Sequence, residues 1–199
     1  MKWRFSINLI LLMCVFLSGF SQASGLLYQT PFKWINDDQR SVSFSDFSGR
    51  PVIITMSYGA CKKICSTTLM RMEQMQNLLD KQHVQVDFVI VGLDPKAETV
   101  EDWHQFRLYR RLNRDNWFFL TGSAADTSKL AAMLGITYWY YYEHVMHDFR
   151  IHLLDKYGNI LTTMKTGGDS VDDFLRPVLP VQGVGDQPAR SPLPAVPAR

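Results

Sequence analysis

The feature that most constrains this chain is an apolar run that leads into two cysteines and then changes to helical spacing. Residues 51–58 are rich in β-branched and other apolar side chains and lie between Gly49 and Gly59, which is typical of a buried strand. From residue 65 onward, large apolar side chains recur at helical spacing: Leu69, Met72, Met75, Leu78 and Leu79. The pattern predicts a strand that delivers Cys61 and Cys65 to the start of a helix.

The spacing of Cys61 and Cys65 admits more than one chemistry. Side chains four positions apart in a helix share one face, and their Cα atoms lie about 6 Å apart, within the range of a disulfide. The positive dipole end of a helix, together with Lys62 and Lys63, favours the thiolate form of both cysteines. Either the pair cycles between dithiol and disulfide, or its thiolates hold a soft metal ion with a further donor. A structural disulfide in an exported protein is the third interpretation.

Residues 1–23 have the pattern of a secretory signal peptide. Lys2 and Arg4 precede an apolar run over residues 9–20, and residues 21–23 form a small-x-small cleavage pattern. The alternative is an uncleaved anchor, although a run of about twelve residues is shorter than the roughly 20 that span a bilayer. In both cases we expect a periplasmic or other extracytoplasmic location, where thiols oxidise unless they are kept reduced or bound to metal.

Charge and composition limit the domains and partners of the chain. It has 199 residues, with 21 Lys and Arg against 19 Asp and Glu, and cleavage would remove two basic residues and no acidic one. A mature chain without net charge gives no electrostatic reason to expect nucleic acid as a partner. Residues 24–179 fit one domain, which we expect to be monomeric, and the Pro-rich residues 180–199 predict a disordered tail.

The middle of the chain alternates between strand and helix patterns. Residues 84–93 form a second apolar strand, which Asp94 and Pro95 end, and Thr99 with Asp102 marks the start of a second helix. A strand, helix, strand order implies a parallel pair joined by a crossover. The patterns that follow predict a strand over residues 117–120 and a short helix over residues 126–134.

The last part of the predicted domain is antiparallel. The aromatic residues 137–142 predict an extended segment. Residues 138–142 could form a docking surface, but the simpler expectation is that alternate side chains belong to the core. Residues 150–154 and 160–164 flank a turn and predict a hairpin, and Asp169 or Ser170 caps a final helix. The whole order indicates the α/β class and a thioredoxin-like fold, with a central mixed sheet flanked by helices and a CxxxC motif at the first strand-to-helix junction.

The histidines discriminate between the two chemistries, because a copper site with two thiolates needs at least one more donor and a redox dithiol does not. His83, at a helix-to-strand turn, and His104, on the helix face opposite Phe106, are weaker ligand candidates. His152 alternates with apolar residues within a strand, so we expect its side chain in solvent. His144 and His147 precede that strand in a segment that we predict to be a loop over the start of the first helix, where functional groups concentrate.

Several motifs follow one another at defined spacings. They are Asp46-Phe47-Ser48-Gly49-Arg50-Pro51 before the first long strand, Tyr58 three residues before Cys61, Cys61-x-x-x-Cys65-x-Thr67-Thr68-Leu69, Asp94-Pro95, and His147 eight residues before Asp155 in a segment that ends at Gly158. Taken together, over about residues 44–165, the chain resembles the SCO/SenC family of copper chaperones for cytochrome c oxidase.

The resemblance implies a thioredoxin-like fold with a copper ion held by Cys61, Cys65 and His147. It also implies a periplasmic carrier, rather than an enzyme, that exchanges copper with a respiratory copper enzyme such as cytochrome c oxidase or with another copper carrier. Lys62 and Lys63 replace residues that are usual in the family, and a cationic loop favours thiolate chemistry. The alternative function is therefore a thiol-disulfide oxidoreductase that uses Cys61 and Cys65 to reduce the cysteines of a copper site in a partner protein.

Asp94 has two interpretations that stay open at the level of sequence. It follows a buried strand, so we expect it at the carboxyl end of that strand, on the same edge that presents Cys61. Its carboxylate either caps the turn at Pro95 or lies near the thiols, where it would tune their protonation or orient a partner's cysteine.

Overall fold

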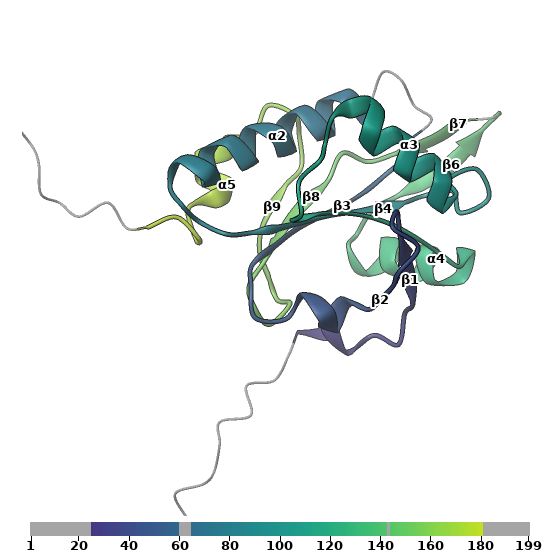
Figure 1. The fold of residues 1–199 in the computed structure, drawn as a ribbon, viewed down its shortest axis with the longest axis horizontal. Helices are drawn as coiled ribbons and strands as arrows, with labels where there is room; N and C mark the ends of the chain where they lie inside the picture. The colour runs from purple at the N-terminus through teal and green to yellow at the C-terminus, as the bar shows by residue number, and fades with distance from the viewer. Residues whose placement is uncertain (1–24, 60–64, 143, 181–199) are drawn as a thin grey trace, which may run out of the picture.

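The computed structural model describes residues 25–59, 65–142 and 144–180, with the side chains of residues 65 and 66 excepted. The predicted signal peptide lies outside these residues, and so do Cys61 and all of the predicted tail except Pro180. Between these limits, strands and helices follow one another in nearly the predicted order (Figure 1).

A seven-stranded mixed sheet forms the centre of the described molecule, in the order β2-β1-β5-β4-β3-β8-β9. Its strands are β1 (Trp34–Asn36), β2 (Ser41–Val42), β3 (Val52–Ser57), β4 (Asp87–Gly92), β5 (Trp117–Gly122), β8 (Ile151–Leu154) and β9 (Ile160–Met164). β3, β4 and β5 are parallel, whereas β8 pairs antiparallel with β3 and β9 pairs antiparallel with β8. Parallel units followed by an antiparallel hairpin confirm the thioredoxin-like fold that we expected.

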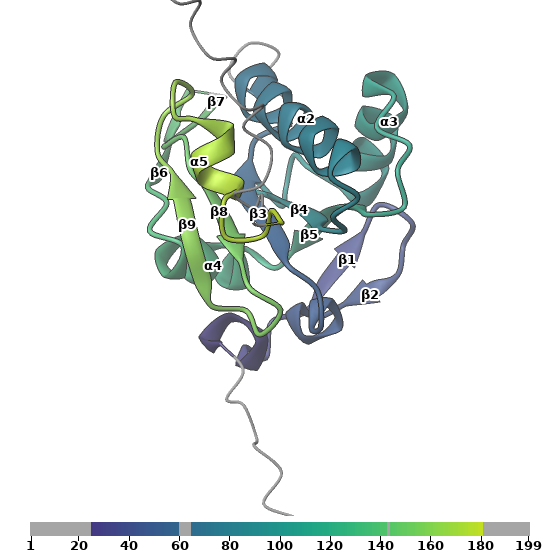
Figure 2. The same cartoon turned by 90° about the vertical axis from the view of Figure 1, so that its left-hand side faces the viewer.

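Helices cover both faces of this sheet (Figures 1 and 2). On one face lie α2 (Cys65–Lys81), α3 (Val100–Arg110) and α5 (Val171–Leu175). On the other face lie α4 (Ala124–Met133) and the short 3-10 helices η2 (Leu26–Gln29) and η3 (Phe44–Phe47). Within the part of the chain that the structure describes, no helix combines the length and apolar character needed to cross a bilayer.

The predicted starts of α3 and α5 are confirmed by capping side chains that accept a main-chain N–H, whereas the helix predicted to begin at residue 126 begins at Ala124, because Ser123 caps it. At the start of α3, the hydroxyl of Thr99 accepts from the N–H of Asp102 at 3.2 Å, and the Asp102 carboxylate accepts from the N–H of Thr99 at 2.9 Å. At the start of α5, the hydroxyl of Ser170 accepts from the N–H of Asp173 at 3.2 Å. Such caps satisfy N–H groups that the helix itself leaves unpaired.

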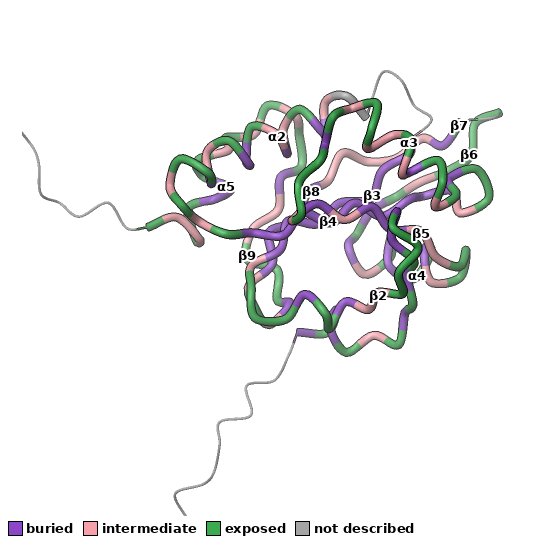
Figure 3. The backbone as a smooth tube through the Cα atoms, in the orientation of Figure 1, coloured by how far each residue is buried: buried purple, intermediate pink, exposed green. Residues whose placement is uncertain are grey.

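The sheet separates two apolar clusters, because neighbouring residues of a strand point to opposite faces. Ile53 of β3 packs with Met72, Met75 and Trp103 beneath α2 and α3, whereas Ile54 belongs to the cluster on the side of α4. All six residues of β3 are buried, and Figure 3 shows the buried backbone through the middle of the sheet. Each large side chain buried in this way contributes about 1.5–3 kcal/mol to folding.

A separate two-stranded ribbon consists of β6 (Tyr138–Tyr141) and β7 (His144–His147). The prediction that His144 and His147 lie in a loop is wrong, because the aromatic run provides a strand with which they pair. Tyr138 lies opposite His147, and Tyr141 lies opposite His144.

The aromatic residues of this ribbon are mostly exposed, so the prediction that alternate members belong to the core is also wrong. Trp139 is 50% exposed, and Tyr140 and Tyr141 are each 59% exposed, whereas Tyr138 packs partly against the core. The ribbon is not part of the central sheet and can turn only one of its faces toward the body. Its other face therefore stays in contact with solvent.

His152 is buried, contrary to the expectation that it is solvated. Its strand, β8, lies between β3 and β9, and both faces are covered, so all four residues of the strand are buried. Nε2 donates a hydrogen bond to the carbonyl oxygen of Leu134 at 2.9 Å, and Nδ1 accepts one from the hydroxyl of Thr163 at 2.9 Å. Leu134 ends α4, so the imidazole satisfies a carbonyl group at a helix end.

We expect His152 to make the folded state less stable in acid. Burial lowers the pKa of His152 to about 4 from its ordinary value of 6.5. The unfolded chain therefore takes up a proton near pH 6.5, whereas the folded chain resists protonation until about pH 4. The free energy of unfolding is therefore not reduced by this histidine above pH 6.5, and it decreases as the pH falls toward 4. At pH 5 the decrease is about 2 kcal/mol.

Urea unfolding of the wild type and of His152→Gln between pH 5 and 7.5 measures this effect. Other titrating groups are common to both proteins, so the difference between the two free energies of unfolding isolates His152. A difference that does not change with pH would show that His152 does not lower its pKa on folding.

Candidate thiol and metal site

The carboxyl ends of β3 and β4, the start of α2 and the β6–β7 ribbon lie at the same end of the molecule (Figures 1 and 2). β3 and β4 stay in register to their last residues, where Ser57 lies opposite Gly92. The N–H of Leu93 then donates to the carbonyl of Ser57 at 3.0 Å. Cys65 is the first residue of α2, as the helical spacing predicts, whereas Cys61 falls in the segment 60–64 outside the described residues.

Glu98 is a buried carboxylate beside the strand end that leads to the cysteines, and no sequence motif marked it. One carboxylate oxygen accepts the main-chain N–H of Gly59, and the other accepts the N–H of Asp94 at 2.7 Å. The residue is 2% exposed, and burial raises the pKa of Glu98 to about 7 although these N–H donors oppose the shift. The carboxylate therefore joins the end of β3 to the loop that follows β4.

Gly59 and Gly92 have no side chains, and Glu98 and Trp103 fill the space that side chains at these positions would need. A Cβ at Gly59 would lie 3.2 Å from the indole ring of Trp103, and a Cβ at Gly92 would lie 3.1 Å from a carboxylate oxygen of Glu98. Trp103 itself stacks on Phe119, with the ring centroids 5.4 Å apart. A cavity of about 160 Å³ opens beside these groups and is lined by Gly59, Ala97, Glu98, Asp102, Trp103 and Phe106.

Asp94 lies just after β4, which agrees with the predicted position at the carboxyl end of that strand. Its carboxylate accepts the N–H of Lys96 at 3.2 Å, which is a turn-capping contact. Tyr140 lies beside this carboxylate, and burial together with the negative charge of Asp94 raises the pKa of Tyr140. Asp94 therefore connects the loop after β4 to the β6–β7 ribbon, a contact that no sequence pattern indicated.

His147 lies on the same face of β7 as the buried Val145, whereas the exposed His144 lies on the other face. Nδ1 of His147 is 2.9 Å from the carbonyl oxygen of Asp148. A carbonyl oxygen only accepts hydrogen bonds, so Nδ1 carries a proton, and in the neutral imidazole Nε2 carries the lone pair. Nε2 is buried and has no hydrogen-bond partner among the residues that the structure describes. A buried donor atom of this kind fits a metal ion.

A larger cavity, of about 470 Å³, is not part of this site. It surrounds Asp87, the first residue of β4, whose carboxylate forms an ion pair with Arg50 at 3.0 Å. The six residues of β4 separate Asp87 from the strand end near Glu98 by roughly 16 Å. The cavity therefore lies at the opposite edge of the sheet from Cys65.

Comparisons with known proteins agree with the fold and with the family that the motifs resemble. The model of the SCO1/SenC family matches residues 21–176. The SCO1 protein homolog of Bacillus subtilis (strain 168) is 27% identical over 92 residues, which are 46% of this chain and 48% of that protein. The chain spans about half the length of the curated relatives that it matches.

Solved structures share the fold over a larger part of the chain. Arabidopsis thaliana ScoI with copper bound has a TM-score of 0.66 and 22% identity, covering 78% of this chain and 95% of that chain. A SCO1/SenC family lipoprotein from Bacillus anthracis str. Ames has a TM-score of 0.68 and 21% identity, covering 74% and 90% of the two chains. Since the family model extends from before β1 into the end of α5, the chain belongs to the SCO1/SenC family.

Proposed function

We propose that this protein binds copper outside the cytoplasm and passes it to a respiratory copper enzyme such as cytochrome c oxidase. The proposed ligands are the thiolates of Cys61 and Cys65 and Nε2 of His147. Family membership and the copper bound in the related Arabidopsis thaliana ScoI support the proposal. Thiolates suit Cu(I), and an added imidazole lets the same site accept Cu(II).

The state of His147 is the observation that carries the proposal. Its Nδ1 hydrogen bond to the carbonyl of Asp148 fixes the tautomer, and the lone pair of Nε2 has no described partner. Histidines that bind metals characteristically donate their second ring N–H to a carbonyl or carboxylate in this way. This hydrogen bond therefore orients the imidazole and leaves Nε2 as the ring atom that can bind a metal ion.

Other residues of the chain prepare the site by charge and position. Cys65 begins α2, where the helix dipole and free N–H groups favour a thiolate. Glu98 holds the N–H of Gly59, two residues before Cys61, and the contact between Asp94 and Tyr140 holds the ribbon that carries His147. These contacts limit how far the segment that leads to Cys61 and the ribbon that carries His147 can move apart.

The proposed location follows from the amino terminus and from a relative. Residues 1–23 have the pattern of a signal peptide, and the related protein from Bacillus anthracis is a lipoprotein. An oxidising compartment also requires that Cys61 and Cys65 be reduced before copper can bind. The carrier would therefore depend on a reductant in that compartment.

Copper binding is expected to require the dithiol form of the protein. The reduced protein should retain one copper ion per chain after gel filtration, because both thiolates are available as ligands. The same protein with a disulfide between Cys61 and Cys65 should retain much less, because a disulfide offers no thiolate. Equal copper retention by the two forms, or none by either, would contradict the proposal.

A second candidate function is thiol-disulfide exchange with the copper site of a partner protein. Glu98 favours it, because a buried carboxylate with a pKa of about 7 beside the cysteine segment can exchange protons at neutral pH. In this reaction one thiolate of the pair attacks a sulfur of the partner's disulfide and forms a mixed disulfide. The other thiolate then attacks this protein's own sulfur in the mixed disulfide, which forms the Cys61–Cys65 disulfide and expels the partner's second thiolate. Two electrons therefore pass to the partner, whose two thiolates take up protons from solvent.

The two functions differ in their need for His147. Disulfide exchange with a peptide that carries a CxxxC disulfide should be abolished by Cys61→Ser and by Cys65→Ser, and should be unchanged in His147→Ala. Copper binding should respond to all three substitutions. A protein that exchanges disulfides rapidly, yet keeps no copper when reduced, would favour the oxidoreductase.

A further inference from the structure

A second group of metal-ligand side chains lies in a different part of the fold, between the β1–β2 turn and the middle of α3. One donor atom each from Asp37, Asp38 and His104 lies within 4.8 Å of the other two. These residues share no ligand with the thiol site. We propose that they form a separate site for a divalent transition-metal ion such as Zn²⁺.

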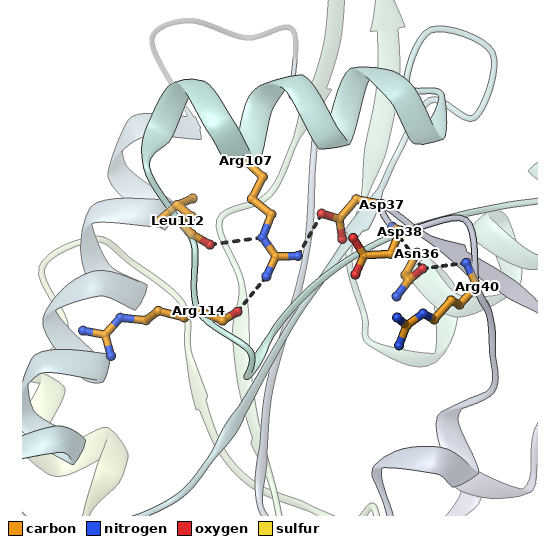
Figure 4. Close-up of polar contacts among 7 residues, drawn as sticks. All are labelled: Asn36, Asp37, Asp38, Arg40, Arg107, Leu112 and Arg114. Atoms are coloured by element: carbon orange, nitrogen blue, oxygen red, sulfur yellow. Dashed lines mark hydrogen bonds and ion pairs between the residues drawn. The ribbon is translucent and has the colours of Figure 1, made fainter.

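Asp37 provides the observation that points to a ligand. Its side chain is 1% exposed, and one carboxylate oxygen accepts from Nη1 of Arg107 at 2.8 Å. The other oxygen, Oδ1, is buried and has no hydrogen-bond partner among the described residues. Figure 4 shows the carboxylates of Asp37 and Asp38 next to each other, with the guanidinium of Arg107 on the far side of Asp37. A buried carboxylate oxygen left in this state is costly unless a cation binds it.

Arg107 is held by main-chain carbonyls and does not hydrogen-bond the second oxygen of Asp37. Its Nε donates to the carbonyl of Leu112 at 3.2 Å, and Nη2 donates to the carbonyl of Arg114 at 2.6 Å (Figure 4). Each of its three nitrogens therefore already has an acceptor. The guanidinium neutralises one carboxylate charge, which leaves the second carboxylate and the imidazole of His104 to attract a cation.

The turn that carries the two aspartates is rigid enough to position them. The side-chain oxygen of Asn36 accepts the N–H of Asp38 at 3.1 Å and the N–H of Arg40 at 2.8 Å. Ligands of one zinc ion lie about 3–3.5 Å apart, because Zn–N and Zn–O distances are about 2.0–2.2 Å. Asp38 is exposed and His104 is partly exposed, so rotation of these two side chains can close the remaining gap.

The donor set selects the kind of metal. Two carboxylates and one imidazole suit Zn²⁺ and its neighbours among divalent ions, whereas Cu(I) prefers the sulfur donors that this cluster does not contain. Three protein ligands also leave a coordination position for water or for a further group. The two sites should therefore separate metals by ligand chemistry, with copper on sulfur and zinc on oxygen and nitrogen.

The test is zinc titration by calorimetry on the Cys61→Ser/Cys65→Ser protein, in which the thiol site is absent. We expect one zinc ion per chain, and at least about a 10-fold loss of affinity in His104→Ala and in Asp38→Asn made in the same background. His83→Asn is the matched control, because His83 lies after α2 and is not part of the cluster. Zinc should also raise the melting temperature of the background protein, and it should raise that of His104→Ala by less.

Two results would overturn the proposal. One is no stoichiometric zinc binding by the background protein at micromolar concentration, and the other is unchanged affinity when both His104→Ala and Asp38→Asn fold normally by circular dichroism. Because the cysteines are absent from this experiment, its outcome does not depend on whether the thiol site binds copper.

Discussion

Replacement of His147 by Ala is expected to weaken copper(II) binding by at least about 100-fold. Loss of a residue that only hydrogen-bonds to a metal ligand usually weakens metal binding by about 10- to 100-fold, and loss of a ligand itself should cost at least as much. The imidazole is the proposed nitrogen ligand, and its Nε2 is already buried and without a described partner. Copper(I) should be affected less, because the thiolates of Cys61 and Cys65 supply its preferred donors. Competition with a chelator of known affinity, carried out separately for the two oxidation states, measures both effects.

His144→Ala is the matched control for this experiment. His144 lies on the same strand, β7, but on the face opposite to His147, and its side chain is exposed. Its removal should leave both copper affinities unchanged. Equal losses in the two variants would mean that the ribbon, rather than the His147 imidazole, determines copper binding.

Replacement of Glu98 by Ala is expected to destabilise the protein by about 3 kcal/mol at pH 5.5, because it leaves the buried N–H groups of Gly59 and Asp94 without an acceptor. It should also weaken copper binding by about 10-fold, since the end of β3 that leads to Cys61 loses its anchor. Denaturant unfolding and the same chelator competition measure the two effects.

The destabilisation caused by Glu98→Ala should shrink as the pH rises. The pKa of Glu98 is raised from 4.5 to about 7 on folding, so its titration contributes stability that is fully present below pH 4.5 and is lost as the pH rises through 7. Glu98→Ala has no carboxyl group here to titrate, so its stability does not change in this way. The difference in free energy of unfolding between the wild type and Glu98→Ala should therefore fall to about 1 kcal/mol at pH 8.

Glu101→Ala provides the comparison, because Glu101 is an exposed acid in the first turn of α3, three residues after Glu98, and its carboxylate accepts a hydrogen bond from the side chain of Gln105. It should change stability little at any pH. If Glu98→Ala unfolded at the same denaturant concentration as Glu101→Ala, the proposed anchoring of Gly59 would be wrong.

The parts of the fold that could be predicted from sequence are those that depend on local patterns. The apolar run before the cysteines became β3, Cys65 begins α2, and Thr99 with Asp102 caps α3. Each of these features is determined by residues within one or two turns of the chain. The parallel order of β3 and β4 followed because a helix joins them.

The predictions that failed depended on which element covers a strand. His152 alternates with apolar residues and would be solvated in a strand with one free face, but the end of α4 covers it and offers the carbonyl of Leu134. The aromatic residues of β6 pair with β7 outside the central sheet, so Trp139 and Tyr141 remain exposed. Contacts between elements that are far apart in the sequence do not produce a periodic pattern of apolar and polar residues, so the sequence alone does not predict them.

The candidate site divides in the same way. Cys65, Asp94 and His147 could be selected from motif and position. The start of α2, the end of β4 and the β6–β7 ribbon, which carry or adjoin these residues, lie at one end of the molecule (Figure 1). Glu98 could not be selected, because an acid just before a helix is ordinarily an exposed capping group. Only the packing of Gly59, Gly92 and Trp103 around it makes it a buried anchor.

X-ray absorption at the copper edge tests the central claim most directly, because it reports the ligand atoms themselves. The reduced wild-type protein loaded with one equivalent of copper(II) under anaerobic conditions should show two sulfur ligands and one imidazole nitrogen. In His147→Ala the imidazole contribution should disappear while the sulfur contribution remains. A wild-type spectrum without sulfur, or an imidazole contribution that persists in His147→Ala, would contradict a copper site built from Cys61, Cys65 and His147.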